Sequence, residues 1–136
     1  MNRRDLLGLI GTAAISPMPS RAQKPMPLIG YMRGGSASFY APILPAFHDG
    51  LRETGYVEGE NVRIEYRWAE GDYDRLPGFA AEFVSRPVDV IAATGGNRSP
   101  SEAKKATSTT PIVFTSGDDP VAAGLVARPC GLIRWR

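Results

Sequence analysis

Three short polar corners hold the residues of this 136-residue chain that are best suited to bind a small molecule. They are Arg33-Gly34-Gly35-Ser36, Thr94-Gly95-Gly96-Asn97 and Thr115-Ser116-Gly117-Asp118. Hydroxyls, free backbone N–H groups and helix N-termini suit a carboxylate or another polar group. The carboxylate of Asp118 would suit an ammonium group. These corners therefore indicate recognition of a small polar ligand.

The patterns expected of an enzyme or a metal site are missing from the sequence. It contains no G-x-x-x-x-G-K-[ST] or G-x-G-x-x-G phosphate loop and no G-x-S-x-G elbow. His48 and Cys130 are the only histidine and the only cysteine, too few for a zinc site of the usual kind or an internal disulfide. No nucleophile, base and orienting group can be assembled, so we expect neither catalysis nor a cofactor.

The elements that position the corners are short apolar strands. Residues 28–32, 88–93 and 111–114 each lead directly into one corner. The run at 88–93 is almost wholly apolar, which is typical of a strand buried on both faces of a parallel sheet. Ligands of such sheets bind beyond the carboxyl ends of the strands. We therefore expect the three corners to lie at one edge of the sheet.

A fourth strand is expected at Val62–Trp68, where apolar and charged residues alternate. This alternation is typical of an edge strand with one solvated face. The face would carry Arg63, Glu65 and Arg67, which are interpreted as solvated charges.

Helices are predicted between the strands. Apolar positions at helical spacing predict a first helix that ends at Gly55 and a second that is capped by Asp74: Tyr40, Leu44, Phe47 and Leu51, then Leu76, Phe79, Ala80 and Phe83. Ser99 and Glu102 form a capping box, with Pro100 as the first helical residue of a third helix. Residues 121–126 could begin a fourth helix. The resulting order, β-α-β-α-β-α-β, favours an α/β fold with a doubly wound parallel sheet.

Residues 1–22 are predicted to be a cleavable signal peptide. Arg3 and Arg4 precede a short apolar run, and small residues at Ser20 and Ala22 mark the expected cleavage site. The export route would be the general secretory route or the twin-arginine route, with the periplasm as destination. Removing this segment takes away three basic residues and one acidic residue, which leaves no net charge. The sequence therefore offers no basic track for nucleic acid.

The chain resembles the ABC transporter substrate-binding proteins. The resemblance rests on several stretches in the same order: Gly55-Tyr56-Val57-Glu58-Gly59-Glu60-Asn61-Val62, Glu65-Tyr66-Arg67-Trp68-Ala69-Glu70-Gly71, Asp74-Arg75-Leu76-Pro77, Val90-Ile91-Ala92-Ala93-Thr94-Gly95-Gly96, Pro111-Ile112-Val113-Phe114, Asp119-Pro120-Val121 and Gly124-Leu125-Val126. It implies a type I periplasmic-binding-protein fold, in which two α/β lobes close over a ligand and the loaded protein docks on a membrane permease. Carried onto this chain, it implies an amino acid or similar small polar ligand. The candidate contacts are Ser36, Thr94, Gly95, Thr115, Ser116 and Asp118.

The resemblance also implies a domain division. Residues 23–127 correspond to a single, N-terminal lobe of that fold. Residues 128–136 depart from the family pattern and are interpreted as an aberrant tail, as a frameshift or an early stop would produce. A lobe without its opposing half is expected not to function alone, because ligands of two-lobe receptors are buried between the lobes.

Two other hypotheses remain open from the sequence. One is a small cofactor-binding enzyme with flavodoxin-like topology. The other is a stand-alone periplasmic sensor or partner-binding module that uses an exposed sheet edge.

Overall fold

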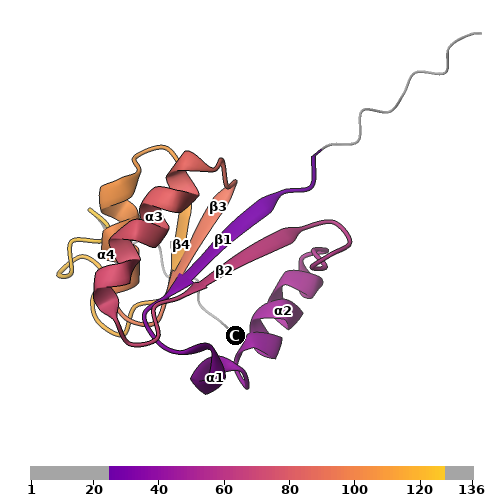
Figure 1. Ribbon diagram of the computed structural model, residues 1–136, viewed down its shortest axis with the longest axis horizontal. Helices are drawn as coiled ribbons and strands as arrows, with labels where there is room; N and C mark the ends of the chain where they lie inside the picture. The colour runs from indigo at the N-terminus through magenta and orange to yellow at the C-terminus, as the bar shows by residue number, and fades with distance from the viewer. Residues whose placement is uncertain (1–24, 128–136) are drawn as a thin grey trace, which may run out of the picture.

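A four-stranded, wholly parallel sheet organises the computed structural model, which describes residues 25–127. The strands are β1 (Leu28–Arg33), β2 (Arg63–Trp68), β3 (Val90–Thr94) and β4 (Ile112–Phe114), in the spatial order β2-β1-β3-β4 (Figure 1). The predicted signal peptide and C-terminal tail lie outside the described residues. The edge position predicted for the strand at 62–68 is confirmed, because β2 pairs with β1 alone.

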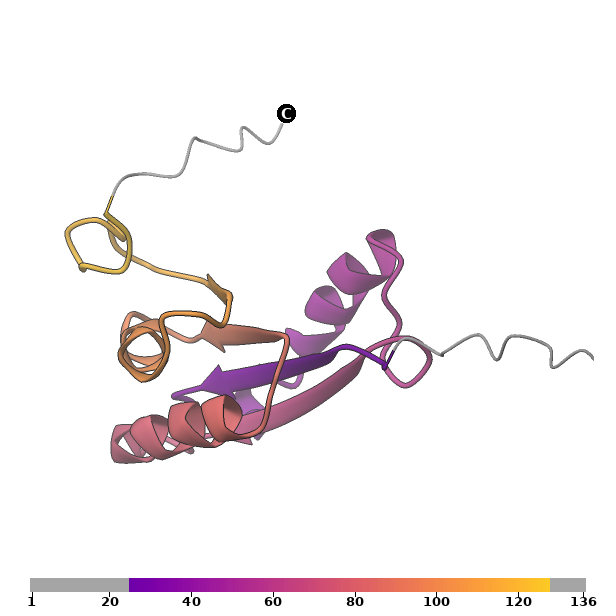
Figure 2. The same cartoon turned by 90° about the horizontal axis from the view of Figure 1, so that it is seen from above.

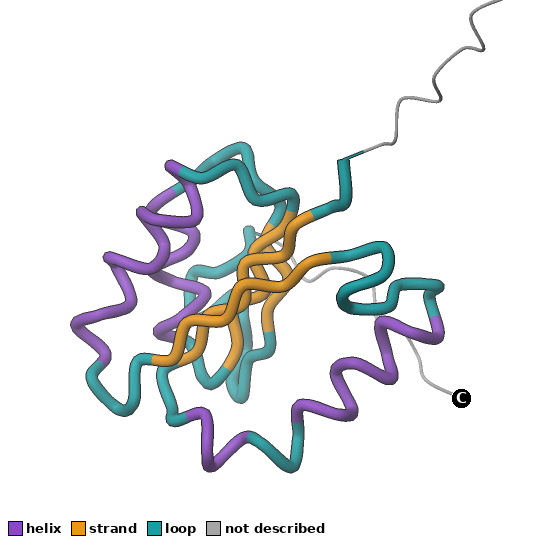
Figure 3. Tube along the Cα trace, turned by 45° about the vertical axis from the view of Figure 1, so that its right-hand side comes forward, coloured by secondary structure: helices purple, strands orange, loops and turns teal. Residues whose placement is uncertain are grey.

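Helices cover both faces of the sheet, as the doubly wound prediction requires. On one face lie α3 (Leu76–Ser85) and α4 (Arg98–Ala106), and on the other lies α2 (Leu44–Glu53), preceded by the single turn α1 (Ala37–Tyr40). Figures 2 and 3 show α2 apart from the α3–α4 pair, with the strands between them. The α/β fold class is therefore confirmed.

The first helix starts later than predicted. The chain leaves α1 at Tyr40, passes through a turn that contains Pro42, and begins α2 at Leu44 with Pro45 in its first turn. Proline lacks an N–H and is tolerated in a helix only near its start. Pro42 therefore lies in the turn after α1, and Pro45 lies in the first turn of a second helix, α2. Tyr40 is thereby separated from the predicted stripe of Leu44, Phe47 and Leu51.

Two predicted helix caps are wrong. The side chain of Asp72, rather than that of Asp74, caps the short 3₁₀ turn Tyr73–Arg75 that leads into α3. The third helix begins at Arg98, one residue before the predicted cap, so Ser99 lies inside the first turn and is completely buried. The tertiary packing of Ser99 against the core therefore overrides the local capping preference.

The predicted fourth helix is also absent. Residues 120–124 form hydrogen-bonded turns, with the Ala123 N–H bonded to the Asp119 carbonyl at 2.9 Å. Gly124 then adopts φ +68, a left-handed conformation that ends a helical path.

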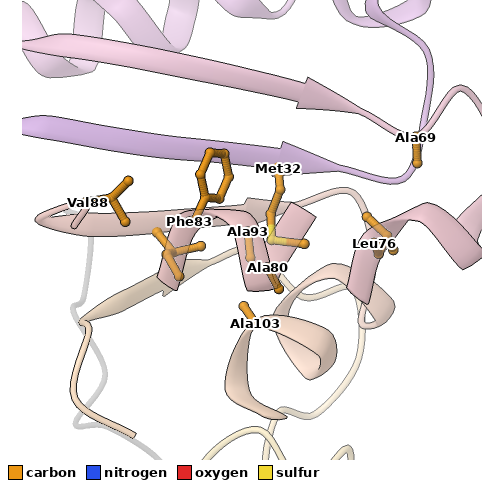
Figure 4. Packing of buried hydrophobic residues seen from close by; sticks show 9 residues of the cluster. Met32, Ala69, Leu76, Ala80, Phe83, Val88, Ala93 and Ala103 are labelled. Carbon is orange, nitrogen blue, oxygen red and sulfur yellow. The ribbon is translucent and has the colours of Figure 1, made fainter. Parts of the chain in front are cut away.

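The hydrophobic core lies between the sheet and the α3–α4 pair (Figure 4). Phe83 of α3 is its largest fully buried side chain, and it packs over Gly30 of β1, where an added Cβ would lie 2.8 Å from the ring. Met32, Ile91 and Ala93 contribute from β1 and β3. This packing fixes β1 and β3 side by side at the centre of the molecule.

The charged face of β2 is only partly the solvated surface that its alternation predicted, because Arg63 is exposed but Glu65 and Arg67 are partly buried. Arg67 donates from Nε and Nη2 to the Glu82 carboxylate of α3, at 3.0 and 2.6 Å. Arg86, the residue directly after α3, donates to Glu65 at 2.8 Å, and the side chain of Glu65 is only 20% exposed. These ion pairs hold the end of α3 over the edge strand, a contact that period-two alternation cannot reveal.

Candidate functional site

The carboxyl ends of β1, β3 and β4 form one rim, and all three predicted corners lie along it. The chain leaves β1 toward the face covered by α2 and leaves β3 toward the face covered by α4 (Figure 1). The strand order consequently reverses between β1 and β3. In open α/β sheets, the crevice at such a switch point is where ligands bind.

Arg33 and Thr94 face each other across this switch point. They are register partners at the last positions of β1 and β3, and the Arg33 Nη1 donates to Thr94 Oγ1 at 3.3 Å. The Tyr31 hydroxyl joins both, accepting from Thr94 Oγ1 at 2.9 Å and from Arg33 Nη1 at 3.2 Å. A cation and two hydroxyls are thus brought together by two neighbouring strands.

The guanidinium of Arg33 is held from two further sides. Its Cζ lies 3.1 Å from the centroid of the Tyr40 ring, a cation–π contact. Its aliphatic stem crosses Gly95, where an added Cβ would lie 2.7 Å from Arg33 Cγ. Gly95 has φ +86, a left-handed conformation that glycine adopts without strain. The space that a side chain at Gly95 would occupy is therefore filled by the Arg33 stem and is not open to a ligand.

A second polar cluster lies between the ends of β3 and β4. Asn97 donates from Nδ2 to Asp118 Oδ2 at 2.7 Å and accepts at Oδ1 from Ser116 Oγ at 2.6 Å. The backbone N–H of Asp118 donates to Ser116 Oγ at 3.3 Å. Two of the predicted contacts, Ser116 and Asp118, are therefore brought together through Asn97, whose amide was not among the candidates.

The remaining two candidates have local structural partners. Ser36 caps α1, since its Oγ accepts from the Phe39 N–H at 3.3 Å. Thr115 continues the β4 ladder, and its N–H donates to the Ala93 carbonyl at 3.4 Å. Both residues lie at the rim, and neither touches the Arg33 group through a hydrogen bond within residues 25–127.

Sequence reasoning missed Arg33 as a site residue. The residue stands first in the Arg33-Gly34-Gly35-Ser36 corner, directly after a buried strand. The signal that could have identified it is a charged residue at the end of an apolar strand, directly before a glycine pair. Tyr31 was hidden for the opposite reason, because its alternation with Met32 reads as ordinary strand packing.

His48 contacts Tyr66, whose ring centroid lies 5.4 Å from that of Tyr31. Its Nε2 lies 2.7 Å from the Tyr66 hydroxyl and 3.1 Å from Glu58 Oε2, so it links α2 to β2 and to the loop before β2. Burial, and then the negative charge of Glu58, raise the pKa of Tyr66 above its ordinary range. Tyr66 therefore stays protonated at physiological pH and donates to Glu58 at 3.2 Å. His48, Tyr66 and Glu58 thus form a hydrogen-bonded cluster that connects α2 to β2.

A cavity of about 400 Å³ lies between α2 and the sheet. Its walls are mainly apolar and include Ile29, Phe47, Leu51, Val90 and Val113. None of the six candidate contacts lines it. Because a polar ligand needs hydrogen-bonding partners when it is buried, the rim is a better candidate site than this mainly apolar cavity.

Residues 25–127 contain neither a grouping of metal ligands nor a long apolar helix. No group of three or more His, Cys, Asp or Glu side chains in this part of the chain is arranged to hold a metal ion. No helix within the same residues has the length and apolar character needed to cross a bilayer.

Comparison with known proteins agrees with this architecture. The family model described as "ABC transporter substrate binding protein" matches residues 40–130. The chain belongs to this family. The match begins in α1 and runs through β2, β3 and β4. It therefore includes two of the three polar corners, at residues 94–97 and 115–118.

One curated relative has a name that states what it binds. The "Tyrosine-binding protein" of Clostridioides difficile is 38% identical over 80 residues, which are 59% of this chain and 23% of that protein. The chain thus spans about a quarter of the relative's length. The relatives found are substrate-binding proteins rather than enzymes.

Solved structures of similar proteins share the fold. A ligand-free, open substrate-binding protein with adhesive properties from Clostridium difficile has a TM-score of 0.68 at 31% identity, over 75% of this chain and 34% of that one. A conserved domain protein from Vibrio cholerae gives 0.68 at 29% identity, over 76% and 34% of the two chains. A Streptococcus pneumoniae domain in complex with L-Trp gives 0.66 at 24%, over 75% and 34%, and it shows the fold alone. The chain therefore matches about a third of each solved relative.

Proposed function

We propose that this chain is the solute-binding component of an ABC importer and that residues 25–127 form one wall of its ligand site. The ligand is a small polar molecule such as an amino acid, held at the carboxyl ends of β1, β3 and β4. The observation that carries the proposal is the meeting of Arg33 and Thr94 across the switch point between β1 and β3. The tyrosine-binding relative, 38% identical over 80 residues, supports an amino acid as ligand.

The candidate contacts divide into two groups within this proposal. Thr94 and Gly95 present a hydroxyl and a turn beside the cation, and Ser116 and Asp118 present a hydroxyl and a carboxylate one strand further along. A ligand with separate acidic and basic groups matches this division of charge. Ser36 and Thr115 would contribute at the ends of the rim.

The partner and the location follow from the family membership and the sequence pattern. We propose that the protein is exported to the periplasm by a cleavable signal at residues 1–22, along the general secretory or the twin-arginine route. There the loaded receptor would present its ligand to an ABC permease in the inner membrane.

The described wall is expected to bind weakly on its own. Small-molecule sites bury most of the ligand surface, whereas residues 25–127 are proposed to supply only one wall of the site. Asp118 is exposed and Thr94 is only half-buried. We therefore expect ligand dissociation constants in the millimolar range or weaker, because few contacts are fully desolvated.

A binding titration followed by NMR tests the proposal, since it detects weak and local contacts. The full chain is titrated with L-tyrosine and with a panel of other amino acids. Saturable shifts should centre on the backbone amides of residues 94–97 and 115–118, and Thr94→Val should reduce them. Thr109→Val, a matched change in the exposed loop before β4, should have no effect.

Two results would contradict the proposed function. One is the absence of any saturable shift at the rim across the whole panel. The other is shifts that centre on the apolar cavity beneath α2, which would move the ligand site to Ile29 and Phe47.

A further inference from the structure

The guanidinium of Arg33 has hydrogen-bonding capacity that the described chain does not use. A guanidinium carries five N–H donors and accepts nothing. Only Nη1 has partners, the hydroxyls of Tyr31 and Thr94. Nε is buried and makes no hydrogen bond, and Nη2 makes none to any residue from 25 to 127. An orphaned donor of this kind costs free energy until a partner arrives.

The positive charge of Arg33 is also not compensated by any carboxylate among residues 25–127. None of the ion pairs among residues 25–127 includes it. The Oε1 of Glu70 accepts a hydrogen bond from the backbone N–H of Ala37, at 3.3 Å, and does not pair with Arg33. The immediate neighbours of the guanidinium are the neutral hydroxyls of Tyr31 and Thr94 and the ring of Tyr40. A half-buried cation in such surroundings favours an anionic partner.

The geometry of the unused donors selects the kind of anion. Nε and Nη2 form one edge of the guanidinium plane, and this edge matches the two oxygens of a carboxylate. Nη1, on the remaining side, is anchored to β3 through Thr94. Tyr40 on one face and Gly95 beneath the stem hold the plane in place. These contacts keep the guanidinium at the rim when no ligand is bound.

From these observations we infer that Arg33 is the anchor for the carboxylate of the ligand, through its Nε–Nη2 edge. Arg33 then acts as the specificity-determining residue of the rim, since a ligand without a carboxylate leaves the cation unpaired. Because Nε is covered in the ligand-free arrangement, the stem shifts across Gly95 as the carboxylate enters. The identity of the carboxylate-bearing ligand rests on the proposed function, but the affinity of Arg33 for a carboxylate does not.

Small probe molecules test the affinity of Arg33 for a carboxylate separately from the identity of the ligand. The full chain is titrated with acetate, with inorganic phosphate, and with the pair L-tyrosine and tyramine, which differ by one carboxylate. The signals followed are the Arg33 Nε–H and the Gly95 amide. Acetate and L-tyrosine should give saturable shifts at both signals, and tyramine should bind at least about tenfold more weakly than L-tyrosine, as expected for losing one charge-assisted pair.

Variants separate the anchor from the fold. Arg33→Gln should abolish the acetate response, and Arg33→Lys should weaken it, because lysine keeps the charge but loses the two-donor edge. Arg75→Gln is the matched control, since Arg75 is an exposed arginine that stacks on Phe79, with its Cζ 5.2 Å from the ring centroid. It should leave the response unchanged, and circular dichroism should show native secondary structure in all three variants.

The outcomes distinguish the carboxylate anchor from the proposed function. Acetate shifts that persist in Arg33→Gln, equal binding of L-tyrosine and tyramine, or tighter binding of phosphate than of acetate would each overturn the carboxylate anchor. Binding of L-tyrosine at the rim that is unchanged in Arg33→Gln would leave the proposed function standing without the anchor. An acetate response without any amino-acid binding would support the anchor and refute an amino acid as ligand.

Discussion

Arg67 of β2 and Glu82 of α3 form a two-pronged ion pair, with N–O distances of 2.6 and 3.0 Å. The pair ties the edge strand to the helix that covers the core. Hydrogen bonding from Arg67 is the main cause that lowers the pKa of Glu82, although partial burial acts in the opposite direction. The side chain of Glu82 is 36% exposed, so solvent screens the interaction.

We expect Glu82→Gln to destabilise the protein at neutral pH by less than about 1 kcal/mol. Because the folded-state pKa of Glu82 is lowered, its contribution is present above the unfolded pKa, about 4.3, and is lost as pH falls through the folded value. The difference from wild type should therefore close below about pH 4. Urea unfolding at several pH values measures it. Glu60→Gln, at an exposed turn residue without an ion pair in residues 25–127, should show no such trend.

Gly30→Ala should destabilise the protein by about 1 to 3 kcal/mol, as overpacking of a core does. The new Cβ would lie 2.8 Å from the Phe83 ring, which is fully buried and has little room to move. Gly50→Ala in α2 is the opposite case, because nothing lies within 4 Å of its added Cβ and alanine favours a helix. Thermal unfolding should show a lower midpoint for the first variant and an equal or higher one for the second. Equal midpoints would refute the close approach of β1 and α3.

Ser99→Ala should stabilise the protein by about 1 kcal/mol. The Ser99 side chain is completely buried at the start of α4, and its Oγ has no hydrogen-bond partner among residues 25–127. Removing the hydroxyl relieves that cost, and alanine also has the higher helix propensity. Chemical denaturation measures the change. A loss of stability instead would mean that Ser99 Oγ has a partner in solution, and Ser101→Ala, at a less buried position on α4, provides the comparison.

Gly95→Ala and Gly96→Ala should both destabilise the protein, because their φ angles are +86 and +97. Each loses about 1 kcal/mol to the left-handed backbone. Only the Gly95 variant also pushes on the Arg33 stem, since nothing lies within 4 Å of a Cβ at Gly96. The Tyr40 ring protons and the Arg33 Nε–H should therefore shift in the NMR spectrum of Gly95→Ala alone. Unchanged signals there would show that Arg33 does not cross Gly95.

The amino-acid sequence alone determined the order of the elements and the edge where the three corners meet. Apolar runs such as residues 88–93 are short-range patterns, and parallel pairing then places their carboxyl ends together whatever the details of packing. The family membership was equally visible in local stretches. The helix starts were not, because Asn97 and Asp72 took the capping positions that Ser99 and Asp74 were expected to fill.

Only the tertiary structure decided which side chains meet at the rim. Arg33 and Thr94 are 61 residues apart, and their contact depends on the register of β1 against β3, which no local pattern encodes. The pairing of Arg67 with Glu82 depends likewise on how α3 lies across β2. Periodicity reports which face of an element is apolar, whereas the partner that a polar side chain finds is set by the packing of elements distant in sequence.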